Sequence, residues 1–189
     1  MYTPREWTRE VELRDGTPIL LRPEVEDDLE MLWEMYSSLS VESLRFMPSP
    51  FTRELVEGWI ENLDYERVPP IVALTEGPPR RIVASATLAF NPSDAFRHKA
   101  EFGIAVQDDF QGKGLGTTLA RHMIEIARSK GIVKITLLVV TVNRKAVDLY
   151  RRQGFRIEGS LEREHFNYVT GEYGADYMMA LFLQPPTEA

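Results

Sequence analysis

A glycine-rich loop separates an apolar, strand-like run from a segment with helical periodicity. Residues 101–106 have the composition of a strand, and the loop at residues 111–117 carries glycines at positions 112, 114 and 116. Leu115, Leu119 and Met123 recur at helical spacing, which predicts a helix packed on a core. Alternate glycines allow the backbone to approach a ligand, and the first amides of a helix attract an anion. The sequence therefore predicts an α/β chain with a diphosphate site at this junction.

Two common diphosphate-binding loops do not fit this spacing. A P-loop requires Ser or Thr directly after Gly-Lys, but here Gly114 follows. A dinucleotide-binding fingerprint requires its third glycine at position 117, which is Thr117. It also requires an acid after the next strand, where the sequence has Thr141. The pattern that remains is Gln-x-x-Gly-x-Gly, which starts at Gln111.

A second loop-to-helix junction follows the strand predicted at residues 134–140. Residues 143–155 read Asn-x-x-Ala-x-x-Leu-Tyr-x-x-x-Gly-Phe. Asn143 is suited to cap the start of a helix, and Gly154 is suited to follow its end. The sequence thus predicts a strand, a glycine loop, a helix, another strand and a capped helix, in this order.

The other elements are predicted from apolar alternation and from turn residues. Asp15 and Gly16 predict a hairpin between two short strands, and Pro23 precedes a helix with one apolar face. A second helical region is expected at residues 41–63, where prolines interrupt it. Further strands are predicted at residues 71–74, 82–90, 155–159 and 177–183. The chain has neither internal repeats nor a linker-like tract, so a single domain over residues 1–189 is expected.

The two loop-to-helix junctions resemble the signatures of the GNAT superfamily of N-acetyltransferases. The resemblance covers roughly residues 16–183 and is strongest over residues 101–159. It implies the α/β (α+β) GNAT fold, which is a mixed, mostly antiparallel sheet of six to seven strands with helices on both faces. It also implies that the strands at residues 101–106 and 134–140, the fourth and fifth of the family, splay apart. Acetyl-CoA is the implied co-substrate, and no metal is expected.

The resemblance assigns acetyl-CoA binding mainly to backbone groups. The pantetheine arm is expected along the free edge of the strand at residues 104–106, the diphosphate on the glycine loop, and Asn143 on the pantetheine side. Lys113 adds a neutralising charge to the loop. The expected coenzyme-binding residues are Ile104, Ala105, Val106, Gln111, Gly112, Lys113, Gly114, Leu115, Gly116, Thr117 and Asn143.

Acetyl transfer to an amine requires a base and an acid. An amine attacks a thioester as the free base, whereas a lysine amine with a pKa of about 10.4 is protonated at neutral pH. The resemblance assigns Tyr150 to protonation of the departing sulfur. It assigns the role of base to Glu101, because relatives that acetylate protein lysines have a glutamate here, in an Ala-Glu-Phe context like that of residues 100–102. His98 is the alternative base. His122 is expected to be solvated, and His165, in the loop before the last predicted strand, is a candidate to line a substrate cleft.

The composition is that of a globular protein and limits its partners. Of the 189 residues, 43% are hydrophobic and 27% are charged, which excludes a disordered chain. The net charge of −7 disfavours nucleic acid and anionic membranes as partners, and it suits a cationic acceptor. The sequence has neither an apolar run long enough to span a bilayer nor a signal-peptide core. A cytoplasmic protein, as a monomer or a homodimer, is therefore expected.

Three hypotheses for function remain open from the sequence. A protein lysine is the acceptor that the sequence favours, because residues 13–24 and 39–46 resemble domains that acetylate lysines of acyl-CoA synthetases. A small amine, such as a polyamine, an amino acid or a xenobiotic, is the second, because residues 167–177 resemble acetyltransferases of small amines. A non-catalytic acyl-CoA sensor is the third, and the presence of Tyr150 and Glu101 disfavours it. A wide acidic groove would indicate the first hypothesis, and a closed pocket the second.

Two acidic clusters are candidates for binding a cationic acceptor. One precedes the first predicted helix, and the other follows the strand at residues 155–159. Their members are Glu24, Glu26, Asp27 and Asp28 in the first cluster, and Glu162 and Glu164 in the second.

The absence of cysteine predicts the kinetic order of the reaction. With no thiol to carry an acyl group, the acetyl group should pass directly to the amine within a ternary complex. Initial-velocity lines, measured while both substrate concentrations are varied, should therefore intersect. Parallel lines, or an acetylated enzyme trapped by mass spectrometry, would contradict direct transfer.

Overall fold

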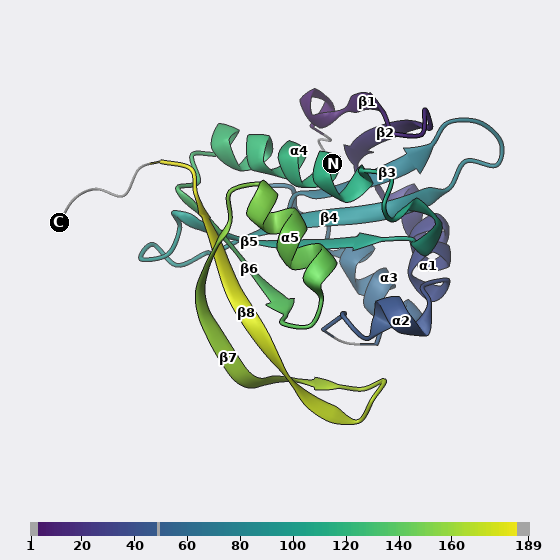
Figure 1. Ribbon diagram of the computed structural model, residues 1–189. Coiled ribbons are helices and arrows are strands. Elements are labelled where there is room, and N and C mark those ends of the chain that lie inside the picture. Colours follow the sequence, from purple (N-terminus) through teal and green to yellow (C-terminus); the bar gives the residue numbers. More distant parts are fainter. Residues whose placement is uncertain (1–3, 49, 185–189) are drawn as a thin grey trace.

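A mixed sheet organises the structure, a computed structural model that describes residues 4–48 and 50–184. Its strands lie in the order β1-β2-β3-β4-β5-β6-β8-β7 (Figure 1). Neighbouring strands are antiparallel except β5 and β6, which run parallel. The strands are β1 (Arg9–Glu12), β2 (Pro18–Pro23), β3 (Pro70–Thr75), β4 (Ile82–Phe90), β5 (Lys99–Val106), β6 (Lys134–Val140), β7 (Arg156–Asn167) and β8 (Glu172–Phe182).

Helices cover both faces of this sheet (Figure 1). α4 and α5 pack on one face, where Leu119, Met123 and Tyr150 join its core. α1 and α3 pack on the opposite face, where Leu32 and Val56 join a second core. We call these the α4–α5 face and the α1–α3 face. The helices are α1 (Leu29–Ser37), α2 (Val41–Leu44), α3 (Arg53–Glu61), α4 (Leu115–Ser129) and α5 (Arg144–Arg152), with 3₁₀ turns η1 (Arg5–Trp7), η2 (Glu26–Asp28) and η3 (Asp108–Phe110).

The central strands match the sequence prediction more closely than the last two. β4 and β6 have the predicted bounds, whereas β7 and β8, at 12 and 11 residues, form a hairpin much longer than expected. Residues of β7 are half-buried or exposed, so no apolar run marked its outer half in the sequence. The helical region expected at residues 41–63 is divided into α2 and α3. The sheet has eight strands, whereas six to seven were expected. β1 pairs with β2 across the predicted turn at Asp15 and Gly16.

β5 and β6 part soon after they begin. Their pairing runs only from Lys99–Lys134 to Glu101–Thr136, although both strands continue further. Beyond this point β5 stays paired with β4, and β6 stays paired with β8. The opening between them, which we call the β5–β6 gap, confirms the predicted splay and leaves each strand with one unpaired edge.

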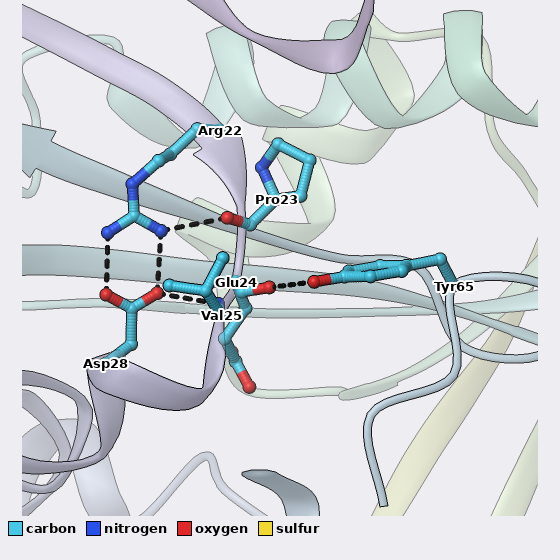
Figure 2. A network of polar contacts seen from close by, with 6 residues as sticks. All are labelled: Arg22, Pro23, Glu24, Val25, Asp28 and Tyr65. Atoms are coloured by element: carbon cyan, nitrogen blue, oxygen red, sulfur yellow. Dashed lines mark hydrogen bonds and ion pairs between the residues drawn. The ribbon is translucent and has the colours of Figure 1, made fainter. Parts of the chain in front are cut away.

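An ion pair fixes the turn between β2 and α1. Arg22 donates two hydrogen bonds of 2.6 Å to the carboxylate of Asp28, and the amide of Val25 donates a third of 2.9 Å (Figure 2). The Asp28 side chain is 1% exposed, so loss of Arg22 would leave a buried charge without its partner. The ion pair therefore sets the direction in which α1 leaves the sheet.

Glu24 lies beside this ion pair and is itself buried. Its backbone carbonyl accepts a hydrogen bond of 2.5 Å from the Tyr65 hydroxyl (Figure 2). Burial, followed by the charge of Asp28, raises the pKa of Glu24 from 4.5 to about 8, although Arg22 lowers it. Glu24 is thus mostly protonated at neutral pH, and Asp28 is paired. These two members of the first acidic cluster are therefore not available to a cationic acceptor, contrary to the expectation from the sequence.

We predict that Glu24→Gln makes the protein more stable at high pH. In the unfolded chain Glu24 ionises near pH 4.5, but in the folded protein it holds its proton to about pH 8. Wild-type stability from this group is therefore complete below pH 4.5 and is lost as the pH rises to about 8. The variant should keep that stability, on the order of 1.36 kcal/mol per unit of pKa difference. Urea unfolding across this pH range measures the effect.

Glu26→Gln is the matched control, because Glu26 is an exposed carboxylate of the same turn. An unchanged pH dependence in Glu24→Gln would contradict the prediction.

Candidate active site

The glycine loop connects η3 to the first turn of α4. Gly112 and Gly114 have φ angles of +76° and +95°, a conformation that residues with a side chain rarely adopt. α4 starts at Gly114 without a side-chain cap, whereas Ser40, Thr52 and Asn143 cap α2, α3 and α5. The first amides of α4 therefore have neither a helical nor a side-chain acceptor. They are free to bind an anion such as a diphosphate.

Gly116 has a different role from the other two glycines of the loop. Its backbone is helical, and a Cβ at this position would lie 3.1 Å from Cδ1 of Leu149 on α5. The glycine thus allows α4 and α5 to pack closely. The sequence argument assigned all three glycines to ligand approach, but it could not detect this contact between two helices.

The β1–β2 hairpin packs against the glycine loop. The amide of Arg14 donates a hydrogen bond of 3.1 Å to the carbonyl of Lys113, and Nζ of Lys113 lies 3.1 Å from Oδ2 of Asp15. Hydrogen bonds from Thr17 and Lys113 lower the pKa of Asp15 to about 2. Lys113 also lies over the ring of Phe110. The charge of Lys113 is therefore held at the loop, although Asp15 neutralises part of it.

The side chain of Gln111 connects the glycine loop to α2, although the residue is exposed. Its Nε2 donates to the carbonyl of Val106 at 3.1 Å and to Oγ of Ser43 at 3.0 Å. Asp108 accepts hydrogen bonds of 2.7 Å from the hydroxyls of both Ser40 and Ser43. Burial raises the pKa of Asp108, but these hydrogen bonds outweigh it, so the pKa lies below its ordinary value. No sequence pattern predicts this network, because Ser40 and Asp108 are far apart in the chain.

The predicted pantetheine site lies along the β5–β6 gap. Ile104, Ala105 and Val106 pair with β4 on one edge and have no strand partner on the other. Asn143 caps α5, because its Oδ1 accepts a hydrogen bond of 3.2 Å from the amide of Ala146. An extended ligand can therefore add to the free edge of β5, with the start of α5 nearby.

Tyr150 lies on α5 at the base of this gap. Its ring packs edge-on against Phe102 of β5, with centroids 6.1 Å apart, and also contacts Phe155. Burial raises the pKa of the Tyr150 hydroxyl. The hydroxyl therefore keeps its proton and remains able to donate it.

Glu101 lies on β5, and His98 directly precedes this strand. Glu101 is therefore the nearer of the two to the glycine loop, which follows β5. Glu101 is at the last paired position before the gap opens. By alternation it shares the α1–α3 face with Gly103 and Ala105, and it is exposed. His98 is also exposed but precedes β5, and its carbonyl accepts from the amide of Val133 at the start of β6. His98 is therefore at the end of the sheet opposite the glycine loop.

Two other histidines differ from their predicted environments. His122 is buried at 3% exposure, and its ring nitrogen lies 2.8 Å from the carbonyl of Trp7, so the prediction of a solvated residue was wrong. Burial lowers the pKa of His122. His165 is within β7, not in a loop, because the strand is longer than predicted.

The tip of the β7–β8 hairpin bends toward α2 (Figure 1). Asn167 donates a hydrogen bond of 3.0 Å to the carbonyl of Arg45, and the Tyr168 hydroxyl donates one of 3.3 Å to the carbonyl of Leu44. The hairpin tip is therefore in contact with the end of α2. Glu162 and Glu164 of the second acidic cluster lie on β7 of this hairpin and are exposed.

A family model describes most of this chain. The model of the acetyltransferase (GNAT) family matches residues 30–155. The matched span includes the glycine loop, Glu101, Asn143 and Tyr150.

Two curated relatives are acetyltransferases with small substrates in their names. The spermidine N(1)-acetyltransferase of Escherichia coli is 35% identical over 85 residues, which are 44% of this chain and 45% of the relative. An L-amino acid N-acetyltransferase of Escherichia coli is 31% identical over 124 residues, which are 65% of this chain and 74% of the relative. This chain thus spans less than half the length of the first relative.

A solved structure is similar over nearly the whole chain. The GNAT domain of S. lividans PAT superposes with a TM-score of 0.79 at 25% identity, covering 96% of this chain and 100% of that domain.

In the described part of our chain, every helix is too short or too polar to cross a membrane. The same residues hold no group of three His, Asp or Glu side chains that would suit a metal ion.

We predict that Gly114→Val weakens the binding of acetyl-CoA at least tenfold. Valine is strained at a φ of +95°, at a cost of about 1–3 kcal/mol, and its side chain would press on Arg14. Relief of this strain would turn the first amides of α4 away from the diphosphate. Isothermal titration calorimetry measures the affinity, and circular dichroism checks the fold.

Gly131→Val is the matched control at the other end of α4. Its φ is +73°, and a Cβ there meets nothing within 4 Å. Unchanged affinity in a folded Gly114→Val variant would contradict the assignment of the loop.

Proposed function

Because this chain belongs to the acetyltransferase (GNAT) family, we propose that it transfers the acetyl group of acetyl-CoA to a primary amine of a small molecule. The observation that carries the proposal is the arrangement at the β5–β6 gap. A loop with free helix amides lies at one end of β5, an unpaired strand edge follows, and Tyr150 lies at its base. Acetyl-CoA is the acetyl donor of the family.

Backbone groups of the protein would bind the diphosphate and the pantetheine arm of the coenzyme. Its diphosphate would accept hydrogen bonds from the amides of Leu115, Gly116 and Thr117, because α4 offers them no side-chain cap. Lys113 would contribute charge, and the amides of the pantetheine arm would pair with Ile104 and Val106 along the free edge of β5. Leu115 is itself 0% exposed, so only its amide takes part. Gln111 would act indirectly, since its side chain is bonded to Ser43 and Val106.

The reaction would proceed by direct attack within this gap. The acceptor ammonium first loses a proton, and its nitrogen then forms a bond to the thioester carbon. Backbone amides of β5 stabilise the oxyanion that results. The carbon–sulfur bond breaks, and the thiolate takes the proton of the Tyr150 hydroxyl. The nitrogen loses its second proton as the amide forms, and this proton restores Tyr150, so the net reaction releases one proton.

Glu101 is our candidate for the first proton acceptor. Its carboxylate is on the α1–α3 face where the gap begins, which is the side that the acceptor would enter. It would act directly or through a water molecule. His98 is a weaker candidate, because three residues, or about 10 Å of extended chain, separate it from Glu101 in the direction away from the gap.

The hairpin favours a small amine over a protein lysine as the acceptor. Hydrogen bonds of Asn167 and Tyr168 hold the hairpin tip to α2, so an acceptor that enters from the α1–α3 side would have to pass beside this contact. A folded protein would have to present its lysine past this contact, whereas a small molecule needs only enough room for its own length. The names of the curated relatives are in keeping with this acceptor class.

A protein lysine is the second candidate acceptor. The segment at residues 39–46 resembles lysine acetyltransferase domains, and it contains α2. Its Ser40 and Ser43 donate hydrogen bonds to Asp108. The similarity to the GNAT domain of PAT also supports this candidate.

Release of CoA against two panels of acceptors tests the proposal. One panel holds polyamines, amino acids and aryl amines, and the other holds lysine-containing peptides and intact proteins. We expect CoA release with members of the first panel and an acetylated product by mass spectrometry. Turnover with the second panel alone would favour protein lysines. Tight acetyl-CoA binding without turnover in either panel would favour an acyl-CoA sensor.

We predict that Tyr150→Phe lowers kcat about 10²- to 10⁴-fold and leaves acetyl-CoA affinity nearly unchanged. The hydroxyl acts only when the thiolate leaves, and the ring would keep its contacts with Phe102 and Phe155.

We predict that Glu101→Gln removes the low-pH limb of the rate profile, because the carboxylate must be ionised to accept a proton. Steady-state kinetics over a pH range measures both effects.

Tyr173→Phe and Glu172→Gln, on the exposed part of β8, are the matched controls. A Tyr150→Phe variant with wild-type kcat would refute the assignment of the acid. A normal low-pH limb in Glu101→Gln would mean that another group, or water, takes the proton.

A further inference from the structure

A histidine–aspartate pair lies on the β7–β8 hairpin, and the mechanism above does not use it. Nδ1 of His165 lies 2.9 Å from Oδ1 of Asp176, and the two side chains are 14% and 9% exposed. β7 bulges between Leu161 and His165, and Arg163 within this bulge has a φ of +53°. The bulge brings His165 opposite Gly174, two residues from Asp176.

Both side chains face the side of the gap from which the acceptor would enter. Leu137 and Val139 of β6 are in the core of the α4–α5 face, so Val140 lies on the α1–α3 face. Val140 pairs with Asp176, which therefore shares this face.

The His165 ring lies over β8 on the same face. A Cβ added to Gly174 would overlap the imidazole of His165, so the ring covers the backbone at this position. Only glycine allows that close approach. The glycine therefore fixes His165 against β8, beside Asp176.

Three polar atoms of this pair are buried without a hydrogen-bond partner among the described residues. They are Nδ1 and Nε2 of His165 and Oδ1 of Asp176. The contact of 2.9 Å has the distance of an ion pair but not the angle of a hydrogen bond. Native proteins satisfy nearly all buried polar atoms, so a cluster of three such atoms on the side where the acceptor would enter indicates ligand recognition.

We propose that Asp176, positioned by His165, binds a second ammonium group of the acceptor, so that the preferred acceptors are diamines or polyamines. A carboxylate that is nine-tenths buried needs a positive partner. Within the described residues, Oδ1 of Asp176 has no hydrogen-bond donor. An ammonium group of a ligand can donate to this oxygen, and a ring nitrogen of His165 that carries no proton can accept a hydrogen bond from the same group. This inference rests on the proposed function.

The spacing suits a long diamine or polyamine. Asp176 pairs with Val140, which is four residues beyond Thr136, where the gap begins. Four residues of strand extend about 13 Å, and β8 lies one strand spacing, or about 4.8 Å, beyond β6. The carboxylate of Asp176 would thus lie about 14 Å from an acetyl group held beside Glu101 and Tyr150. An alkyl chain of about eight carbon atoms, with an ammonium group at each end, spans this distance.

The test compares 1,8-diaminooctane with n-octylamine, which has the same carbon chain and lacks the second ammonium. CoA release gives kcat and KM for each amine. For the wild-type protein we expect kcat/KM at least tenfold higher for the diamine. Asp176→Asn should raise the KM of the diamine at least tenfold, leave its kcat unchanged and leave n-octylamine turnover as in the wild type. His165→Gln should raise the KM of the diamine in the same direction.

Glu172→Gln is the control for loss of a negative charge elsewhere on the hairpin. Turnover of n-octylamine shows within the same experiment that each variant is folded. Equal use of both amines by the wild type, or a full diamine preference in Asp176→Asn and His165→Gln, would overturn this inference and leave the proposed function in place. No CoA release with any small amine would instead refute the proposed function, and this inference with it.

Discussion

The parting of β5 and β6 is the constraint on which the rest of this structure depends. Each strand has a fixed antiparallel partner on its outer side, β4 for β5 and β8 for β6, and only a short parallel pairing joins them. The unpaired edges expose backbone groups that need hydrogen bonds. In the function we propose, the amide groups of acetyl-CoA supply them, and the glycine loop at the end of β5 and Tyr150 at the base of the gap belong to one site.

A polar network links the coenzyme side of the gap to the acceptor side. Asp108 follows β5 and accepts hydrogen bonds from Ser40 and Ser43 of α2, while Gln111 of the glycine loop donates to Ser43. The same α2 offers its last carbonyls to the hairpin tip at Asn167. The loop, α2 and the hairpin are therefore connected through hydrogen bonds between segments far apart in the chain. Charge-assisted bonds to Asp108 are the stronger ones in this network.

The two acidic clusters named from the sequence illustrate how burial changes the meaning of a carboxylate. Asp28 is neutralised by its ion pair with Arg22. Glu24 is buried and has a raised pKa, so neither carboxyl group offers a charge to a ligand. Asp176 belonged to no cluster in the sequence, yet it is the buried carboxylate that faces the α1–α3 side of the gap. Position on the sheet, rather than acidic density along the chain, selects the residue.

The sequence by itself determined the features that depend on local backbone conformation. Positive φ at Gly112 and Gly114, and the cap at Asn143, follow from short-range sterics and hydrogen bonds, so motif spacing was enough to predict the conformation of the glycine loop and the central strands. The tertiary structure alone decided which groups are buried and paired. The burial of His122 and the length of the β7–β8 hairpin depend on segments distant in the chain, because exposure to water and side-chain pairing are set by whichever elements pack together.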